Sequence, residues 1–249
     1  MVFTLAALML SGCQPTIQFS SVLGDLDIPA EIYRPRAGGR TPAVVLLGPC
    51  TGVASYMRDW AEALNAEGYA VLLVDSYAAR LTRNACHAGA SPLVDDVALD
   101  AVAGMQYLAG LPWIDPERIA VMGWSHGASA ALFVEPLAAF YHAPSARAVV
   151  SVYPGCETLG PDVQTPTLLL LAGRDDWTPP RACIRLGSML QAKGLPLSYT
   201  MYPEASHGYD QPGRLRTYLG HRMVYDESAA SDSHLQVSRF LAEQFRAKR

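Results

Sequence analysis

Residues 119–133 have the sequence IAVMGWSHGASAALF, which contains the pentapeptide Gly-Trp-Ser-His-Gly at 123–127. A short apolar run typical of a buried strand precedes Ser125, and an alanine-rich run typical of a helix follows it. A serine between two glycines at such a turn has the pattern of a nucleophile elbow, which exposes the hydroxyl at the edge of a sheet. The alternative is an ordinary serine N-cap of a helix, so the rest of the chain has to decide.

Short apolar runs alternate with longer amphipathic segments along the whole chain. Runs that are apolar on both faces predict buried strands of a parallel sheet. Alternating strands and helices predict an α/β fold, with a mostly parallel central sheet covered by helices on both faces. The strands predicted from these runs are 43–48, 69–75, 118–124, 147–154 and 165–173, and 196–203 is predicted as a further strand; the predicted helices are 54–67, 93–110, 126–141, 180–193 and 229–247.

Three further segments complete this prediction. Residues 16–36 are expected to form an antiparallel hairpin at one edge of the sheet. Residues 76–92 and 208–228 lack a clear period and are expected to be loops near the carboxyl ends of the strands. Open α/β sheets bind their ligands at that edge, so functional side chains are expected there.

The composition is that of an ordinary globular chain. Of its 249 residues 50% are apolar and 17% are charged, and the net charge is −4. Acidic and basic residues are interspersed, which excludes the clustered basic surface of a nucleic-acid-binding protein. Beyond the N-terminus the sequence has no apolar run of the ~18 residues needed to span a bilayer. Residues 13–249 are therefore predicted to form a single domain.

The N-terminal 13 residues, MVFTLAALMLSGC, form a short apolar run that ends in small residues and a cysteine. Leu10-Ser11-Gly12-Cys13 resembles the lipobox of bacterial lipoproteins, which implies a signal peptide over residues 1–12 and lipidation of Cys13. Gln14 favours sorting to the outer membrane, so we expect an exported protein on the periplasmic side, held to the membrane only through Cys13. The alternative is a buried N-terminal strand or helix with an incidental cysteine.

Four cysteines remain, at positions 50, 86, 156 and 183. An even number of cysteines in an exported protein permits disulfides, and four cysteines allow three pairings. Cys50–Cys86 and Cys156–Cys183 are favoured, because each pair follows consecutive predicted strands that would end on the same edge. Four buried free thiols are the alternative. The spacings do not fit a metal site, and no metal is expected.

A serine hydroxyl needs a base to become a nucleophile, and the base needs an acid to orient it. In α/β folds with this elbow the chain order is serine, acid, histidine. Asp175 and Asp176 directly follow one predicted strand, and His207 follows the next. All of them fall on the edge that carries Ser125, so His207 is the predicted base and one of the two aspartates the predicted acid.

Over most of residues 30–245 the sequence resembles the dienelactone hydrolase family of the α/β-hydrolase superfamily. The resemblance rests on the elbow at 123–127, the Asp-x-x-Thr-Pro loop at 175–179 and the Tyr-Pro-x-Ala-x-His segment at 202–207. Counting back from Pro179 places the family's aspartate at Asp175, whereas counting on from Gly173 gives Asp176. The family's namesake has a cysteine nucleophile where this chain has Ser125, which implies serine chemistry with no metal or cofactor.

Two backbone amides are expected to stabilise the oxyanion that forms during such a reaction. One is the amide of His126, directly after the nucleophile. The second should come from the loop after the first buried strand, where the chain has Gly48-Pro49-Cys50-Thr51. Proline has no N–H, so Cys50 is the predicted donor and Thr51 the reserve.

Aromatic residues adjoin every catalytic segment and are candidate walls of a substrate pocket: Trp124, Tyr153, Trp177 and Tyr209. They could equally be core residues. Arg80, Arg83 and His87 lie in the predicted 76–92 loop. The resemblance implies that such residues, Arg83 in particular, bind a substrate carboxylate, and the alternative is that they are solvated loop charges.

The sequence as a whole predicts a serine hydrolase that cleaves small carboxylic esters or lactones through an acyl-enzyme. Two other functions remain open: a non-catalytic binding lipoprotein that retains the fold, and a small serine peptidase. Neither a nucleic acid nor a cofactor is expected as a partner.

Overall fold

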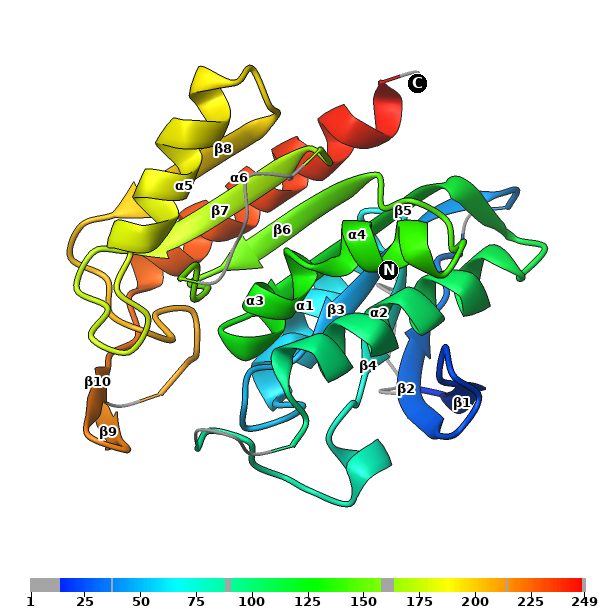
Figure 1. Ribbon diagram of the computed structural model, residues 1–249, viewed down its shortest axis with the longest axis horizontal. Helices are drawn as coiled ribbons and strands as arrows, with labels where there is room; N and C mark the ends of the chain where they lie inside the picture. The colour runs from blue at the N-terminus through cyan, green and yellow to red at the C-terminus, as the bar shows by residue number, and fades with distance from the viewer. Residues whose placement is uncertain (1–13, 37, 88–90, 158–163, 214, 248–249) are drawn as a thin grey trace, which may run out of the picture.

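The computed structural model describes residues 14–36, 38–87, 91–157, 164–213 and 215–247, and Figure 1 shows the arrangement of its elements. The predicted signal peptide at 1–12 and the predicted lipidation site Cys13 lie outside these residues. Among the helices of the described residues, none is long and apolar enough to cross a membrane.

Eight strands form one sheet, in the order β1-β2-β4-β3-β5-β6-β7-β8 (Figure 1). β1 and β2 pair antiparallel at one edge, β2 also pairs antiparallel with β4, and every other pair is parallel. The predicted mostly parallel sheet and its edge hairpin are confirmed. The strands are β1 Thr16–Ser20, β2 Asp27–Tyr33, β3 Thr41–Leu47, β4 Ala70–Val74, β5 Ile114–Trp124, β6 Ala148–Val152, β7 Thr167–Ala172 and β8 Leu197–Tyr202.

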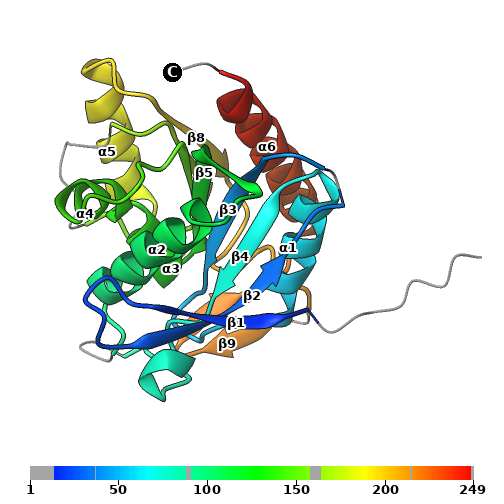
Figure 2. The same ribbon diagram turned by 90° about the vertical axis from the view of Figure 1, so that its right-hand side faces the viewer.

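Helices cover both faces of the sheet, as predicted. Figure 2 shows the two helical layers on either side of the strands, with α1 and α6 in one layer and α2 to α5 in the other. The helices are α1 Ser55–Ala66, α2 Val94–Ala109, α3 His126–Ala131, α4 Val134–Phe140, α5 Arg181–Ala192 and α6 Glu227–Arg246.

The two layers explain why the central strands are apolar without interruption. Successive side chains of a strand point to opposite faces. Val45 and Leu47 of β3 therefore belong to the core beneath α2 to α5, whereas Val44 and Leu46 belong to the core beneath α1 and α6. All four are fully buried, and each such side chain contributes about 1.5–3 kcal/mol of hydrophobic free energy.

The single helix predicted over 126–141 is wrong, because the structure has two helices, α3 and α4, that meet at Leu132 and Phe133. In an unbroken helix Pro136 would have to donate an N–H to the carbonyl of Leu132, and its ring would collide with that carbonyl. Proline is tolerated in the first turn of a helix, and there Pro136 lies in α4.

The order of the strands places two loops at one point of the sheet. β3 has β4 on one side and β5 on the other, so the chain leaves β3 in one direction and later crosses back. This reversal is a topological switch point, where open α/β sheets form their binding crevice. The loop after β3 begins at Gly48 and the turn after β5 at Ser125, so both loops face the crevice.

The segment 208–228, predicted to be a loop, contains a short hairpin formed by β9 (Arg216–Tyr218) and β10 (His221–Met223). Strands of three residues are too short to show an alternating pattern in the sequence. Residues Ala78–Arg80 of the 76–92 loop form a 3₁₀ turn.

Candidate active site

Ser125 forms the sharp turn between β5 and α3, with the backbone angles φ 52° and ψ −113°. A positive φ is strained for a residue with a Cβ, and such strain costs about 1–3 kcal/mol. The flanking glycines allow the close contacts of this turn. A Cβ on Gly127 would lie 2.5 Å from the carbonyl oxygens of Leu47 and Gly48, and a Cβ on Gly123 would overlap the backbone of Gly127. Any larger residue would push α3 away from β5 or β3.

Three side chains form a hydrogen-bonded chain at this turn. His207 Nε2 lies 2.9 Å from Ser125 Oγ, and His207 Nδ1 lies 2.7 Å from Asp175 Oδ2. Asp175 follows the end of β7 and His207 follows the end of β8, so the parallel strands bring them to the edge of the sheet where Ser125 lies. The side chains of His207 and Asp175 are 3% and 1% exposed, which shields their hydrogen bond from water.

Asp175, and not Asp176, is the aspartate that contacts His207. Its other oxygen, Oδ1, accepts hydrogen bonds from the amides of Trp177 (2.9 Å) and Thr178 (2.8 Å). These bonds fix the carboxylate toward the imidazole. The side chain of Asp176 is 51% exposed and lies 3.4 Å from His221 Nδ1 in the β9–β10 hairpin.

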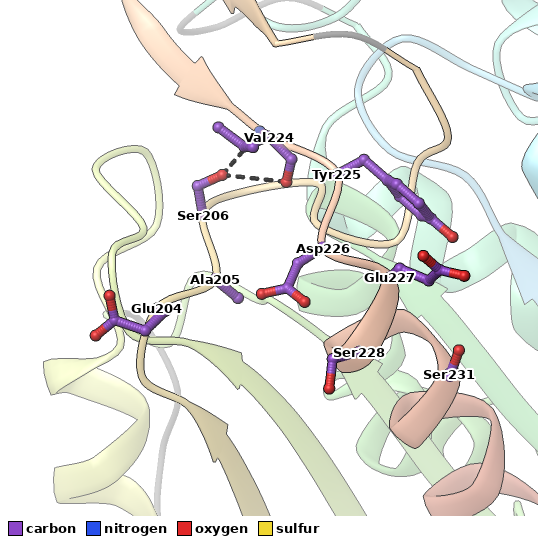
Figure 3. A pocket seen from close by; sticks show the side chains of 9 residues that line it. All are labelled: Glu204, Ala205, Ser206, Val224, Tyr225, Asp226, Glu227, Ser228 and Ser231. Carbon is purple, nitrogen blue, oxygen red and sulfur yellow. Dashed lines mark hydrogen bonds between the residues drawn. The ribbon is translucent and has the colours of Figure 1, made fainter.

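Ser206 attaches the loop that carries His207 to Val224, which lies shortly before α6. Its hydroxyl accepts a hydrogen bond from the amide of Val224 at 2.8 Å and lies 3.5 Å from the carbonyl of the same residue, as Figure 3 shows. The cavity drawn in Figure 3, of about 590 Å³, lies between this loop and the start of α6. Its walls carry the carboxylates of Glu204, Asp226 and Glu227 and no member of the chain Ser125–His207–Asp175.

The loop after β3 forms a turn beside the elbow. The amide of Gly52 donates to the carbonyl of Pro49 at 2.9 Å, so Cys50 and Thr51 occupy the two central positions. The hydrogen bond of the turn uses neither the Cys50 nor the Thr51 amide. His126 is the first residue of α3, and the amide of a first helical residue has no intrahelical acceptor. The amides of Cys50 and His126 are thus not used by their own turn or helix.

Two cavities meet at Ser125, and both are also lined by Cys50 and Trp177. The first, of about 210 Å³, has His207 in its wall. The second, of about 310 Å³, has His126 in its wall. Ser125 therefore lies at the wall of both cavities. The first cavity is further lined by Pro49, Thr51, Ala54, Gln211, Arg216, Tyr218 and Met223, and the second by Ala85, Cys86, His87, Leu93, Val94, Ser129 and Thr178.

Of the four aromatic residues predicted to form the pocket wall, only Trp177 lines a cavity at Ser125. That prediction is wrong for Trp124, Tyr153 and Tyr209, which are at most 1% exposed and lie beneath the site. Their polar groups are paired inside the protein, which satisfies them without a substrate. Trp124 Nε1 and the Tyr153 hydroxyl both donate to Asp210 at 2.7 Å, and the Tyr209 hydroxyl bonds to Ser233 at 2.7 Å.

Asp210 is a buried carboxyl three residues after His207. Burial raises its pKa above the usual value for an aspartate, and the hydrogen bonds from Tyr153 and Trp124 act in the opposite direction. The ring of Tyr153 lies 4.7 Å from that of His207, centroid to centroid. Asp210 therefore supports the His207 loop through Tyr153 without touching a cavity at Ser125.

The three residues of the 76–92 loop that were candidates for binding a substrate carboxylate lie in different surroundings. Arg80 forms an ion pair with the buried Asp100, at 2.7 Å, so the prediction of a substrate contact is wrong for Arg80. Arg83 lines another cavity, beside Asp75 and Tyr77, and does not line the two cavities at Ser125. His87 does line the second of these.

Sequence reasoning missed Ala54 and four residues of the first cavity that follow His207, namely Gln211, Arg216, Tyr218 and Met223. All four belong to the stretch 208–228, where no periodic pattern marks which side chains point inward. The guanidinium of Arg216 donates to the side-chain oxygen of Gln211 and brings a positive charge to this cavity. The one signal in the sequence that could have identified Arg216 is that it is a basic residue shortly after His207.

In the described part of the chain no group of three or more His, Cys, Asp or Glu side chains is arranged to hold a metal ion. Both favoured disulfides are present, Cys50–Cys86 and Cys156–Cys183. The alternative of four free thiols is wrong.

One family model matches most of the chain. The model of the dienelactone hydrolase family matches residues 28–245. Two uncharacterized proteins of Mycobacterium tuberculosis are each 29% identical over 193 residues, which is 69% of this chain. The match spans 64% of the length of these relatives.

Solved structures share the fold at low sequence identity. A dienelactone hydrolase-like promiscuous phosphotriesterase from metagenomic libraries has a TM-score of 0.75 and 18% identity, with 94% of this chain and 99% of that chain covered. A hyperthermophilic esterase from the archaeon Pyrobaculum calidifontis has a TM-score of 0.71 and 17% identity, with 94% and 84% covered. The fold is therefore that of the α/β-hydrolases.

Proposed function

The chain belongs to the dienelactone hydrolase family, and from this premise we propose that it is a serine hydrolase that cleaves carboxylic esters or lactones through an acyl-enzyme. Family and fold support hydrolase activity. The serine mechanism and the substrate class are the proposal. The observation that carries it is the buried chain of hydrogen bonds from Ser125 Oγ through His207 to Asp175 Oδ2.

The proposed mechanism follows from the distances in this chain. His207 Nε2 takes the proton of the Ser125 hydroxyl while Oγ attacks the carbonyl carbon of the ester. Asp175 holds the proton of His207 on Nδ1 and stabilises the imidazolium that forms. His207 then gives the proton to the leaving alcohol, and a water molecule repeats the sequence on the acyl-enzyme.

The amides of His126 and Cys50 are the proposed donors to the oxyanion. They lie on the two loops that meet at the switch point of the sheet, and each is left unused by its own turn or helix. One donor of this kind contributes about 10²–10³ in turnover. The two cavities that meet at Ser125 give the acyl and alcohol parts of a small ester separate spaces.

The two other functions are less well supported. A binding protein needs neither a buried acid behind His207 nor a strained serine, and strain of this kind is typical of functional sites. A serine peptidase would use the same three side chains, so the proposed preference for esters over amides rests on the family.

A fluorophosphonate probe tests the proposal. Ser125 Oγ should attack the phosphorus and release fluoride, and mass spectrometry should find one adduct on Ser125. His207→Ala should remove most of this labelling, because the hydroxyl then has no base. A matched control is His234→Ala, which removes a histidine that stacks on Trp60, away from the site. An unlabelled wild-type protein would contradict the proposed nucleophile.

We also propose that the protein is exported and held to the outer membrane by a lipid on Cys13. The two disulfides support an oxidising compartment. Cys13→Ser should move the protein from the membrane fraction to the soluble fraction of fractionated bacterial cells, with Cys13→Ala as a second variant. A Cys13→Ser protein that still sediments with membranes would contradict the anchor.

A further inference from the structure

We propose that Cys86 is a positioning residue for ester hydrolysis: through its disulfide with Cys50 it holds the Cys50 amide in place for the oxyanion. The inference rests on the proposed function, because an oxyanion forms only if the protein attacks a carbonyl group. It extends that function to the 84–87 segment, which lies far from the catalytic triad in the sequence. We call this segment the strap.

The turn that presents the Cys50 amide has little structure of its own. Its internal hydrogen bond is the one from Gly52 to Pro49, and Gly52 has the positive φ of 77°. Gly48, just before the turn, is in contact with Gly52, since a Cβ there would lie 3.0 Å from the Gly52 carbonyl oxygen. A turn rich in glycine does not by itself fix the direction of an amide.

Two attachments join Cys50 to the strap. The carbonyl of Cys50 accepts a hydrogen bond from the amide of Ala85 at 2.7 Å, and the Cys50 side chain is bonded to Cys86. Cys50 is 7% exposed and lines both cavities that meet at Ser125. One attachment holds the carbonyl oxygen of Cys50 and the other holds its side chain. Together they hold the orientation of Cys50, and with it the direction of its amide.

The far end of the strap is attached to the other side of the site. The side chain of Asn84 accepts from the amide of Cys86 at 2.9 Å and donates to the hydroxyl of Tyr218 at 2.5 Å. The ring of Tyr218 lies 5.8 Å from that of Trp177, whose amide donates to Asp175. The strap therefore links the turn that contains Cys50 to the loop that carries Asp175.

The second disulfide offers a matched control within the same chain. Cys156–Cys183 joins the segment after β6 to α5, and neither cysteine is among the residues that line the two cavities at Ser125. The two disulfides span 36 and 27 residues. They close loops of similar length, so their removal should lower the stability of the fold by similar amounts.

The experiment compares Cys50→Ser/Cys86→Ser with Cys156→Ser/Cys183→Ser. Serine keeps the backbone amide at position 50, so the first variant loses the tether and not the donor. We expect its kcat for p-nitrophenyl acetate to fall by about 10–100-fold with little change in KM, because an oxyanion donor acts in the transition state. The second variant should keep its kcat within about twofold, although both variants melt at lower temperature.

Hydrogen exchange provides a readout independent of activity. The amides of residues 48–54 should exchange faster in Cys50→Ser/Cys86→Ser than in Cys156→Ser/Cys183→Ser, with both measured well below their melting temperatures. Should the first variant not fold, Asn84→Ala tests the same strap with both disulfides intact. It should lower kcat severalfold and leave the circular dichroism spectrum unchanged.

Three outcomes are distinguishable. A wild-type protein that hydrolyses no ester contradicts the proposed function. An active wild type whose Cys50→Ser/Cys86→Ser variant keeps its kcat, while losing as much stability as the control, contradicts the positioning role alone. The same holds for an Asn84→Ala variant with unchanged kcat, if that variant has to replace the first. A selective loss of kcat with faster exchange at 48–54 supports the proposal.

Discussion

Replacing Ser125 by alanine is expected to abolish the hydrolysis of p-nitrophenyl acetate, with a fall in kcat of at least about 10⁴-fold. The reason is geometric. The Ser125 hydroxyl is the group that His207 Nε2 reaches, at 2.9 Å, and the two cavities meet at this residue. Without the hydroxyl the base has no nucleophile to activate, and only binding and the oxyanion amides remain.

The same substitution should leave the fold intact. The backbone at Ser125 has a positive φ that is equally strained for serine and alanine. The side chain gives up one hydrogen bond, so we expect the free energy of unfolding to change by no more than about 1 kcal/mol. Urea unfolding followed by circular dichroism measures this change alongside the rate.

Ser238→Ala is the matched control for the activity. Ser238 lies on α6 and lines neither cavity at Ser125, and its hydroxyl donates to Glu67 at 3.0 Å. This variant should keep the wild-type rate. Equal rates in Ser125→Ala and the wild type would contradict the catalytic proposal and favour a protein that uses the fold for binding.

Local sequence patterns were enough to predict the parallel strands of the sheet and the turn at Ser125. The apolar runs predicted the parallel strands β3 to β7 because these strands are largely buried on both faces, and that burial is determined by each strand's own residues. The sixth predicted parallel strand, β8, lies at the edge of the sheet and is partly exposed. The turn at Ser125 was predictable because the contacts that require its glycines are also local. Gly123 and Gly127 are needed by contacts within the turn or with the adjacent strand β3, so the need for them is recorded in one short stretch of sequence.

Properties that depend on distant partners could not be predicted in this way. Arg80 is tied to Asp100 across 20 residues, and nothing near Arg80 in the sequence indicates a buried partner. Trp124 and Tyr153 adjoin catalytic segments, yet they point into the core because Asp210 supplies an acceptor there. Proximity in sequence to a catalytic residue does not tell on which side of the strand a ring lies.

The choice between Asp175 and Asp176 could not be made from the sequence alone. The two residues are identical and adjacent, and two ways of counting along the motif favour different ones. The structure separates them through the backbone of the loop, because the amides of Trp177 and Thr178 both point at Asp175 Oδ1. Hydrogen-bond directions of this kind are set by the turn, which the residue types alone do not specify.

Asp175→Asn should therefore lower kcat by about 10⁴-fold, as expected when a histidine base loses the acid that fixes its tautomer. The asparagine oxygen can keep the hydrogen bonds from Trp177 and Thr178, and its NH₂ group then faces His207 Nδ1. The imidazole must accept that hydrogen at Nδ1 and carry its own proton on Nε2. A protonated Nε2 cannot take the proton of Ser125.

Asp176→Asn makes the identical chemical change one residue away and should keep kcat within about twofold, because an exposed side chain at the rim contributes little. Asp176 contacts His221 and the amide of Arg222 and does not reach His207. Steady-state rates for both variants, with circular dichroism to confirm folding, decide the matter. A large loss in Asp176→Asn with a small one in Asp175→Asn would mean that the loop turns during catalysis to bring the other carboxylate to His207.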